Sequence, residues 1–177
     1  MDSVPELHKA SAPKSLGIFI ITCSTSKYNE LSNGKSPNDI SGDIIEQQVR
    51  NAAHKIEGRK LISDSKPMIR KTAKSALTSK NVDVIIITGG TGLSPRDVTI
   101  ESISPMFDKE IDGFGELFRK ISFDRIGSPA MLTRAAAGMT KGKAIFCLPG
   151  SPDAVQIALE KLILPELGHI VKVGREH

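Results

Sequence analysis

Short apolar runs that alternate with stretches of helical period constrain the fold of this chain more than any other feature. The clearest run, Val82–Thr88 (VDVIIIT), leads directly into three glycines within four residues. Leu16–Thr22, Arg59–Ser63 and Lys143–Leu148 have a similar character. Short runs of this kind, bounded by turn residues, are typical of buried strands. The sequence therefore predicts four strands.

The stretches between the predicted strands have the spacing of amphipathic helices, with apolar residues recurring on one face. Serine and proline mark several expected helix starts, and glycine marks two expected ends, following the usual preferences of these residues. The expected boundaries are, in order, Ser41 to Gly58, a start after Ser65, a helix around Phe114 and Phe118, Ser128 to Gly138, and a last start at Ser151.

Alternating strands and helices predict an α/β fold with three layers: a mostly parallel sheet with helices on both faces. No linker or repeat divides residues 16–177, so we expect one domain there, preceded by a flexible tail at residues 1–15. The apolar runs are too short to cross a bilayer, and the polar N-terminus lacks the apolar centre of a signal peptide. We expect a cytoplasmic protein without a membrane partner.

Composition excludes some other function classes. The net charge of +4 is mild and spread along the chain, and aromatic residues make up only 4% of it, so we expect no nucleic-acid partner. Cys23 and Cys147 lie at or near the ends of apolar runs and cannot form a disulfide framework, and neither has a histidine or second cysteine at metal-ligand spacing. Buried packing is the expected role of both thiols.

Polar residues follow each predicted strand, where ligands bind in open parallel sheets. Ser24 follows the first strand, Asp64 the second, Gly89–Asp97 the third and Pro149–Pro152 the fourth. These hydroxyls, glycines and carboxylates predict a phosphate-binding rim. The candidate phosphate-binding residues are Ser24, Gly89, Gly90, Thr91, Gly92, Arg96, Gly150 and Ser151.

The segment after the third strand allows two interpretations. Its glycines can bring backbone N–H groups close to an anion, Arg96 can pair with phosphate, and Asp97 is a hard oxygen ligand for Mg²⁺. The same residues can equally form a simple turn in which Asp97 caps a helix. The Walker-type lysine is missing, and Pro95 does not fit a dinucleotide-binding motif.

Asp64 and the segment at Gly150 and Ser151 are ambiguous in the same way. Asp64 can cap the following helix, or it can share a metal ion with Asp97 at the rim. Gly150 and Ser151 begin a helix in either case, and their N–H groups could also hold a second anion. The residues alone leave both alternatives open.

Five motifs resemble those of the MoaB/MogA family of molybdenum-cofactor biosynthesis and follow one another in family order. The resemblance runs from about Leu16 to the C-terminus. The motifs are Asp39-Ile40-Ser41-Gly42, Thr88–Gly92 with Pro95–Thr99, Gly113–Glu116, Leu132-Thr133-Arg134 with Ala137-Gly138, and Leu148–Pro152. One departure is Ser24-Thr25-Ser26-Lys27, where the family often has an Asp-Arg pair.

The resemblance implies an enzyme that transfers AMP from ATP to the terminal phosphate of molybdopterin and releases pyrophosphate. The family's two functional aspartates match Asp64 and Asp97, which we expect to be catalytic and to bind Mg²⁺ directly or through water. It also implies a homotrimer or homohexamer and a MoeA-type metal insertase as the next partner. A non-catalytic molybdopterin carrier and an interaction subunit are the alternatives, and the choice of molybdenum or tungsten stays open.

Overall fold

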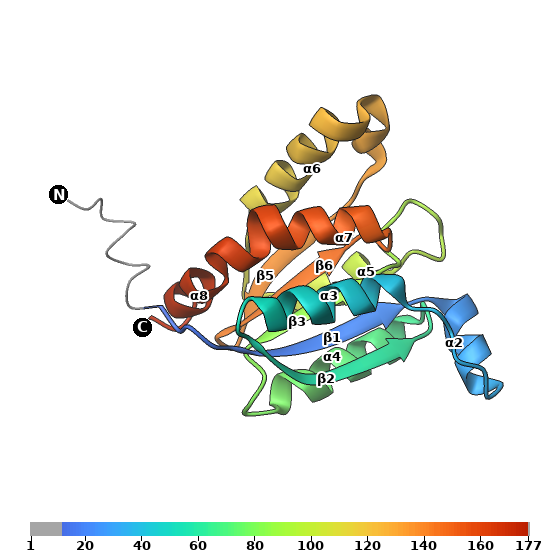
Figure 1. The fold of residues 1–177 in the computed structure, drawn as a ribbon, viewed down its shortest axis with the longest axis horizontal. Coiled ribbons are helices and arrows are strands. Elements are labelled where there is room, and N and C mark those ends of the chain that lie inside the picture. The colour runs from blue at the N-terminus through green and yellow to red at the C-terminus, as the bar shows by residue number, and fades with distance from the viewer. Residues whose placement is uncertain (1–11, 177) are drawn as a thin grey trace.

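The computed structural model describes residues 12–176, so most of the predicted tail lies outside the described residues. One six-stranded sheet forms the centre, with strand order β2-β1-β3-β6-β5-β4 (Figure 1). The first four strands in this order are parallel, whereas β5 runs antiparallel to both β6 and β4. The strands are β1 Gly17–Cys23, β2 Lys55–Ile62, β3 Val84–Thr88, β4 Lys109–Glu110, β5 Ala136–Thr140 and β6 Lys143–Leu148.

Helices pack on both faces of the sheet, which confirms the predicted three-layer α/β class (Figure 1). The α-helices are α2 Thr25–Ser32, α3 Ile40–Asn51, α4 Lys66–Thr78, α5 Thr99–Ile103, α6 Asp112–Ile126, α7 Pro152–Ala158 and α8 Leu164–Val173. Two 3₁₀ turns, η1 (Ser104–Met106) and η2 (Ser128–Leu132), and one π-helical turn, η3 (Leu159–Ile163), complete the chain. Within residues 12–176, no helix is long and apolar enough to span a bilayer.

The central strand β3 shows why two separate cores form. Val84 and Ile86 point to the face covered by α3, α6, α7 and α8, and Ile85 and Ile87 point to the face covered by α4 and α5. All four side chains are fully buried. Because strand side chains alternate between the faces of a sheet, a strand buried on both faces reads as an unbroken apolar run. That is the pattern of this strand.

Two glycines that are expected to end helices lie inside strands, and one cause explains both. Helix α3 ends at Asn51 and Gly58 lies inside β2, while Gly138 lies inside β5 instead of closing a helix. A Cβ on Gly58 would lie 2.5 Å from the ring of Phe19, and one on Gly138 would lie 2.4 Å from the ring of Phe107. Each glycine lies on a strand, where the absence of a side chain leaves room for an aromatic ring, and neither ends a helix.

Several elements are absent from the prediction or differ from it. Strand β2 begins at Lys55, earlier than the predicted Arg59, and only η2 follows Ser128 where a full helix is expected. Helix α2 lies in a polar stretch and contains no buried residue, so it has no apolar stripe to reveal it. Strands β4 and β5 are short antiparallel additions to the sheet.

Candidate functional site

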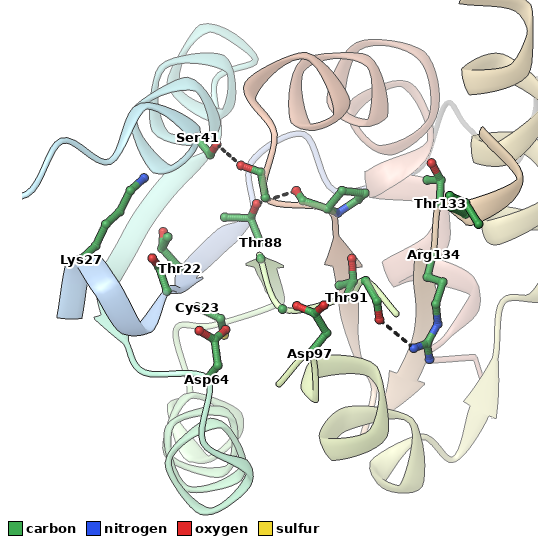
Figure 2. A pocket seen from close by; sticks show the side chains of 17 residues that line it. Thr22, Cys23, Lys27, Ser41, Asp64, Thr88, Thr91, Asp97, Thr133 and Arg134 are labelled. Carbon is green, nitrogen blue, oxygen red and sulfur yellow. Dashed lines mark hydrogen bonds between the residues drawn. The ribbon is translucent and has the colours of Figure 1, made fainter. Parts of the chain in front are cut away.

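A pocket of about 440 Å³ opens at the carboxyl ends of the parallel strands β1, β3 and β6 (Figure 2). Most of the predicted rim lines it. The predicted residues in its wall are Ser24, Asp64, Gly89, Gly90, Thr91, Gly92, Asp97 and Gly150. Arg96 and Ser151 are not among the lining residues; Arg96 is exposed, and Ser151 faces an adjoining depression. The carboxyl ends of the parallel strands thus bring together residues that are far apart in the sequence.

The glycine-rich loop leaves β3 in a conformation that L-residues with side chains rarely adopt. Gly89 and Gly90 have φ angles of +93° and +64°, and a Cβ on Gly90 would lie 2.6 Å from Thr99 Oγ1 and 2.8 Å from Asp64 Oδ1. Thr99 fixes the loop, because its N–H donates to the Gly90 carbonyl at 2.9 Å and its hydroxyl donates to the Gly89 carbonyl at 2.8 Å. Glycine is therefore required at this turn.

Three consecutive N–H groups of this loop have no acceptor within the described part of the chain. Those of Gly90, Thr91 and Gly92 donate no hydrogen bond to any of residues 12–176. All three residues line the pocket. Successive backbone N–H groups in such a turn form a concave anion site. This geometry favours the phosphate-binding interpretation of the loop over that of a simple turn.

Asp64 is held by helix α2, which follows the neighbouring strand β1, and not by the helix that follows Asp64 itself. Its Oδ2 accepts hydrogen bonds from the Thr25 N–H at 2.8 Å and the Thr25 hydroxyl at 2.9 Å, at the start of α2. Helix α4, which follows Asp64, begins without a side-chain cap. The other carboxylate oxygen of Asp64, Oδ1, accepts no hydrogen bond from the described residues and lies beside Gly90.

Asp97 likewise does not cap the next helix. Helix α5 has no side-chain cap, and Asp97 Oδ2 instead accepts the Ser94 N–H at 3.0 Å, back within the loop. The Asp97 N–H donates to the Ser94 carbonyl at 2.8 Å. A Cβ on Gly92 would lie 2.8 Å from Asp97 Oδ2, so only glycine leaves room for this carboxylate. Figure 2 shows Asp64 and Asp97 on the same side of the pocket.

The donor set fits a magnesium ion that also binds phosphate. No group of three or more histidine, cysteine or acidic side chains within residues 12–176 could hold a metal on its own. Mg²⁺ is usually held by only one or two carboxylates, with substrate phosphates and waters as its other ligands. Asp64 and Asp97 offer two half-buried carboxylates with one oxygen each free of hydrogen bonds from the described residues.

Sequence reasoning assigned no role to several residues that the pocket contains. Lys27 and Arg134 bring two cations to its wall. The hydroxyls of Ser41 and Thr88 donate to the carbonyls of Gly150 and Pro149, each at 2.8 Å, and so fix the loop before α7. Ser41, Thr133 and Arg134 belong to motifs that carry the family resemblance, which is the signal that could have found them.

A partly buried ion pair between Asp39 and Arg59 lies next to Lys27. Asp39 is 8% exposed and accepts hydrogen bonds from Arg59 Nη2 at 2.7 Å, Thr22 Oγ1 at 2.8 Å and the Gly42 N–H at 3.2 Å. Burial opposes ionisation of Asp39, but the hydrogen bonds from Arg59 and Thr22 outweigh it and hold the pKa of this carboxyl below its usual value. Lys27 Nζ lies 4.0 Å from Asp39 Oδ1.

Cys23 also lines the pocket but cannot act as a nucleophile at neutral pH. Burial raises the pKa of its thiol to about 12, and the hydrogen bond with Thr99 only partly offsets this. A thiol of that pKa is almost entirely protonated at neutral pH, and the thiolate is the reactive form. Both cysteines are buried, in agreement with the predicted packing role.

A second depression of about 300 Å³ adjoins the pocket between α6 and α7. The two share Thr133 and Pro149 in their walls. Apolar side chains, among them Phe118, Ile126 and Ile157, form much of its lining. A polar, glycine-rich pocket thus continues into a more apolar one, as a ligand with both phosphate and ring parts would require.

Known proteins of similar sequence and structure agree on one family. The family model described as a probable molybdopterin binding domain matches residues 19–169. Molybdenum cofactor biosynthesis protein B of Bacillus cereus is 44% identical over 164 residues, which are 92% of this chain and 93% of that protein. A probable molybdopterin adenylyltransferase of Methanocaldococcus jannaschii is 40% identical over 163 residues, or 92% and 96% of the two chains.

Solved structures give the same result. The tungsten cofactor synthesizing protein MoaB from Pyrococcus furiosus superposes with a TM-score of 0.83 at 38% identity, covering 93% of this chain and all of that chain. A crystal structure of molybdenum cofactor biosynthesis protein B gives 0.84 at 42% identity, covering 93% and 98%. The family that the motifs resemble is thereby confirmed. The chain belongs to the molybdopterin-binding MoaB/MogA family of molybdenum-cofactor biosynthesis proteins.

Proposed function

We propose that this protein is a molybdopterin adenylyltransferase of molybdenum- or tungsten-cofactor assembly. One observation carries the proposal: Asp64, Asp97 and three loop residues whose backbone N–H groups donate no hydrogen bond to the described residues, Gly90–Gly92, line one pocket. Carboxylates alone would repel a polyphosphate, whereas carboxylates that hold Mg²⁺ beside N–H donors would bind it. The relatives' names agree with this chemistry.

In the proposed reaction, an oxygen of the molybdopterin phosphate forms a bond to the α-phosphorus of ATP. The bond between this phosphorus and the bridging oxygen breaks, and pyrophosphate leaves with the electron pair. Two anions must be held in line, so positioning and charge neutralisation supply most of the catalysis. No covalent intermediate with the protein is needed.

The pocket residues divide this work between them. Asp64 and Asp97 would hold Mg²⁺, which supplies charge neutralisation at phosphate oxygens. The N–H groups of Gly90–Gly92 would bind one phosphate, and Lys27 and Arg134 lie in the wall to balance the remaining charge. Ser24, Arg96, Gly150 and Ser151 would make further contacts to phosphate. The apolar depression beside Pro149 would take the ring of one substrate.

The wider setting of the reaction is also proposed. ATP use fits a cytoplasmic protein, and the adenylylated pterin would pass to a MoeA-type metal insertase. A homotrimer or homohexamer is the proposed assembly. Exposed apolar side chains gather on α6 and η2 and offer a surface for contact between copies. They are Leu117, Phe123 and Met131, which we call the α6–η2 patch.

Pyrophosphate release tests the proposal most directly. The purified protein is incubated with molybdopterin and Mg-ATP, and pyrophosphate is measured with and without the pterin. We expect release that depends on both substrates and on Mg²⁺. Pterin binding without turnover would instead identify a carrier, and neither binding nor turnover would point to an interaction subunit.

A further inference from the structure

Arg134 connects the glycine-rich loop to a neighbouring helix. It lies between η2 and β5, and its guanidinium reaches the pocket wall (Figure 2). Nη1 donates to the Gly92 carbonyl at 3.0 Å, and Nη2 donates to Glu101 Oε1, on α5, at 2.5 Å. A single side chain thus bridges the loop and a helix that is packed into the core through Ile103.

The Gly92 carbonyl is the far anchor of the loop. Thr99 holds the near end through the carbonyls of Gly89 and Gly90. Between Gly92 and Asp97, the hydrogen bonds run only between Ser94, Arg96 and Asp97 themselves, among the described residues. Among the described residues, Arg134 donates the one hydrogen bond that ties the Gly92 side of this turn to the rest of the protein, and a variant without it would lose that bond.

The position of Gly92 is coupled to that of Asp97. The space for a Cβ on Gly92 is already filled by Asp97, whose Oδ2 would lie 2.8 Å away. A shift of the Gly92 backbone therefore moves into this carboxylate or away from it. Displacements of about 1 Å at a reacting centre can reduce a rate about 100-fold.

Glu101 is suited to orient Arg134. Burial opposes ionisation of Glu101, but its hydrogen bond with Arg134 outweighs this and lowers its pKa. Its second oxygen, Oε2, is buried and has no hydrogen-bond partner among the described residues. An ionised carboxylate with one strong contact holds a guanidinium in a defined orientation.

We propose that Arg134 is a positioning residue: paired with Glu101, it holds the Gly92 carbonyl and so keeps the Asp97 carboxylate in place for magnesium-bound phosphate. The inference rests on the proposed function for its catalytic consequence. It differs from a role as a simple cation of the pocket wall, because a simple cation would need only a positive charge at this position.

Four variants separate these roles. Arg134→Gln removes the charge and the bridge, whereas Arg134→Lys keeps a charge but cannot reproduce the forked contact to two acceptors. Glu101→Gln keeps Arg134 but removes the negative charge of its partner, so the hydrogen bond between the two side chains is weakened. Arg70→Gln is the matched control, because Arg70 Nε donates to the Ser102 carbonyl on α5 at 3.3 Å without lining the pocket.

Amide hydrogen exchange of the ligand-free protein tests the anchor itself. The N–H groups of Ser94, Asp97 and Thr99 all donate hydrogen bonds within the loop or to it. In Arg134→Gln, we expect those of Ser94 and Asp97 to exchange about tenfold faster, while β3 and β6 keep their protection. Arg70→Gln should match the wild type. Unchanged loop exchange in Arg134→Gln would overturn the proposal.

Kinetics test the consequence for transfer. Arg134→Gln and Arg134→Lys should both need more Mg²⁺ for half-maximal rate and lose kcat, with a smaller change in KM for the pterin. Glu101→Gln should change the Mg²⁺ requirement and kcat in the same direction, but by a smaller factor. Full activity of Arg134→Lys would overturn the proposal in favour of a simple cation. If the wild type transfers no AMP but the loop amides of Arg134→Gln still exchange faster than those of the wild type, the proposed function is contradicted. The role of Arg134 in holding the loop is then still supported.

Discussion

Asp64 and Asp97 define the site at the scale of single residues. Neither carboxylate caps the helix that follows it, so helix capping does not account for either aspartate. Asp64 accepts two hydrogen bonds from Thr25 on one oxygen, and Asp97 accepts one from the nearby Ser94 N–H; the other oxygen of each has no partner among the described residues. A short, hard carboxylate in this state suits Mg²⁺ better than a bare phosphate, in keeping with the proposed role.

The change Asp97→Asn tests this interpretation. Asparagine keeps an oxygen that can accept the Ser94 N–H, so we expect little change in Tm. The loss of charge should lower the rate of AMP transfer by about 100-fold or more, comparable with removal of one transition-state contact. Asp64→Asn should behave similarly, and the double variant should be little worse than either single one. Full activity in both single variants would contradict the catalytic role.

Gly92→Ala makes the steric argument measurable. Its new Cβ would meet Asp97 Oδ2 at 2.8 Å and displace the carboxylate. We expect transfer to fall about 10- to 100-fold while the core strands keep their stability. Gly113→Ala is the matched control, because nothing lies within 4 Å of its Cβ position and it is in α6. Equal activity of the two variants would mean that the loop tolerates a side chain.

The partly buried ion pair of Asp39 and Arg59 makes stability depend on pH. The folded-state pKa of Asp39 is lowered, so its contribution is fully present above the unfolded-state value and is lost as pH falls through the folded-state pKa. Asp39→Asn should therefore lose about 1–3 kcal/mol of unfolding free energy at pH 7. Urea unfolding should show a smaller gap between wild type and variant at about pH 3. A gap that is equal at both pH values would exclude an ionised Asp39.

At the scale of elements, the sequence predicts a strand well where both faces of that strand are buried. It predicts poorly where contacts between residues far apart in the chain determine the local structure. Strand β6 coincides with its predicted range because both of its faces are buried. Gly58 and Gly138 mislead, because the Phe19 and Phe107 rings that explain them come from other strands or loops. The exposed α2 has no periodicity to detect, since none of its side chains is buried.

The candidate site follows the same logic. Residues directly after parallel strands could be located from sequence, because topology alone brings strand ends together. Lys27 and Arg134 could not be assigned in this way, because one lies on an undetected helix and the other precedes a strand that was predicted as helix. Their place in the wall depends on how far each side chain reaches across the pocket.

At the scale of the whole molecule, the α6–η2 patch is the surface that a single copy leaves open. The C-terminal part of helix α6 extends away from the central sheet in Figure 1, and Met131 on η2 is 80% exposed. Phe123 is 59% exposed. A monomer rarely exposes several large apolar side chains on one pair of adjacent elements. A homotrimer or homohexamer would give these side chains a partner.

Analytical ultracentrifugation tests this assembly. At micromolar concentration, we expect a species of about three or six times the 19.0 kDa chain mass. Met131→Arg places a charge in the α6–η2 patch and should shift the protein toward smaller species, because a buried unpaired charge is costly. Leu31→Arg is the control: Leu31 is 47% exposed on α2, outside the patch, so its replacement should leave the assembly intact. Both substitutions fall on exposed side chains, so neither should unfold the chain. A stable wild-type monomer would contradict the assembly, whereas an oligomer that resists Met131→Arg would show that the copies meet on another surface.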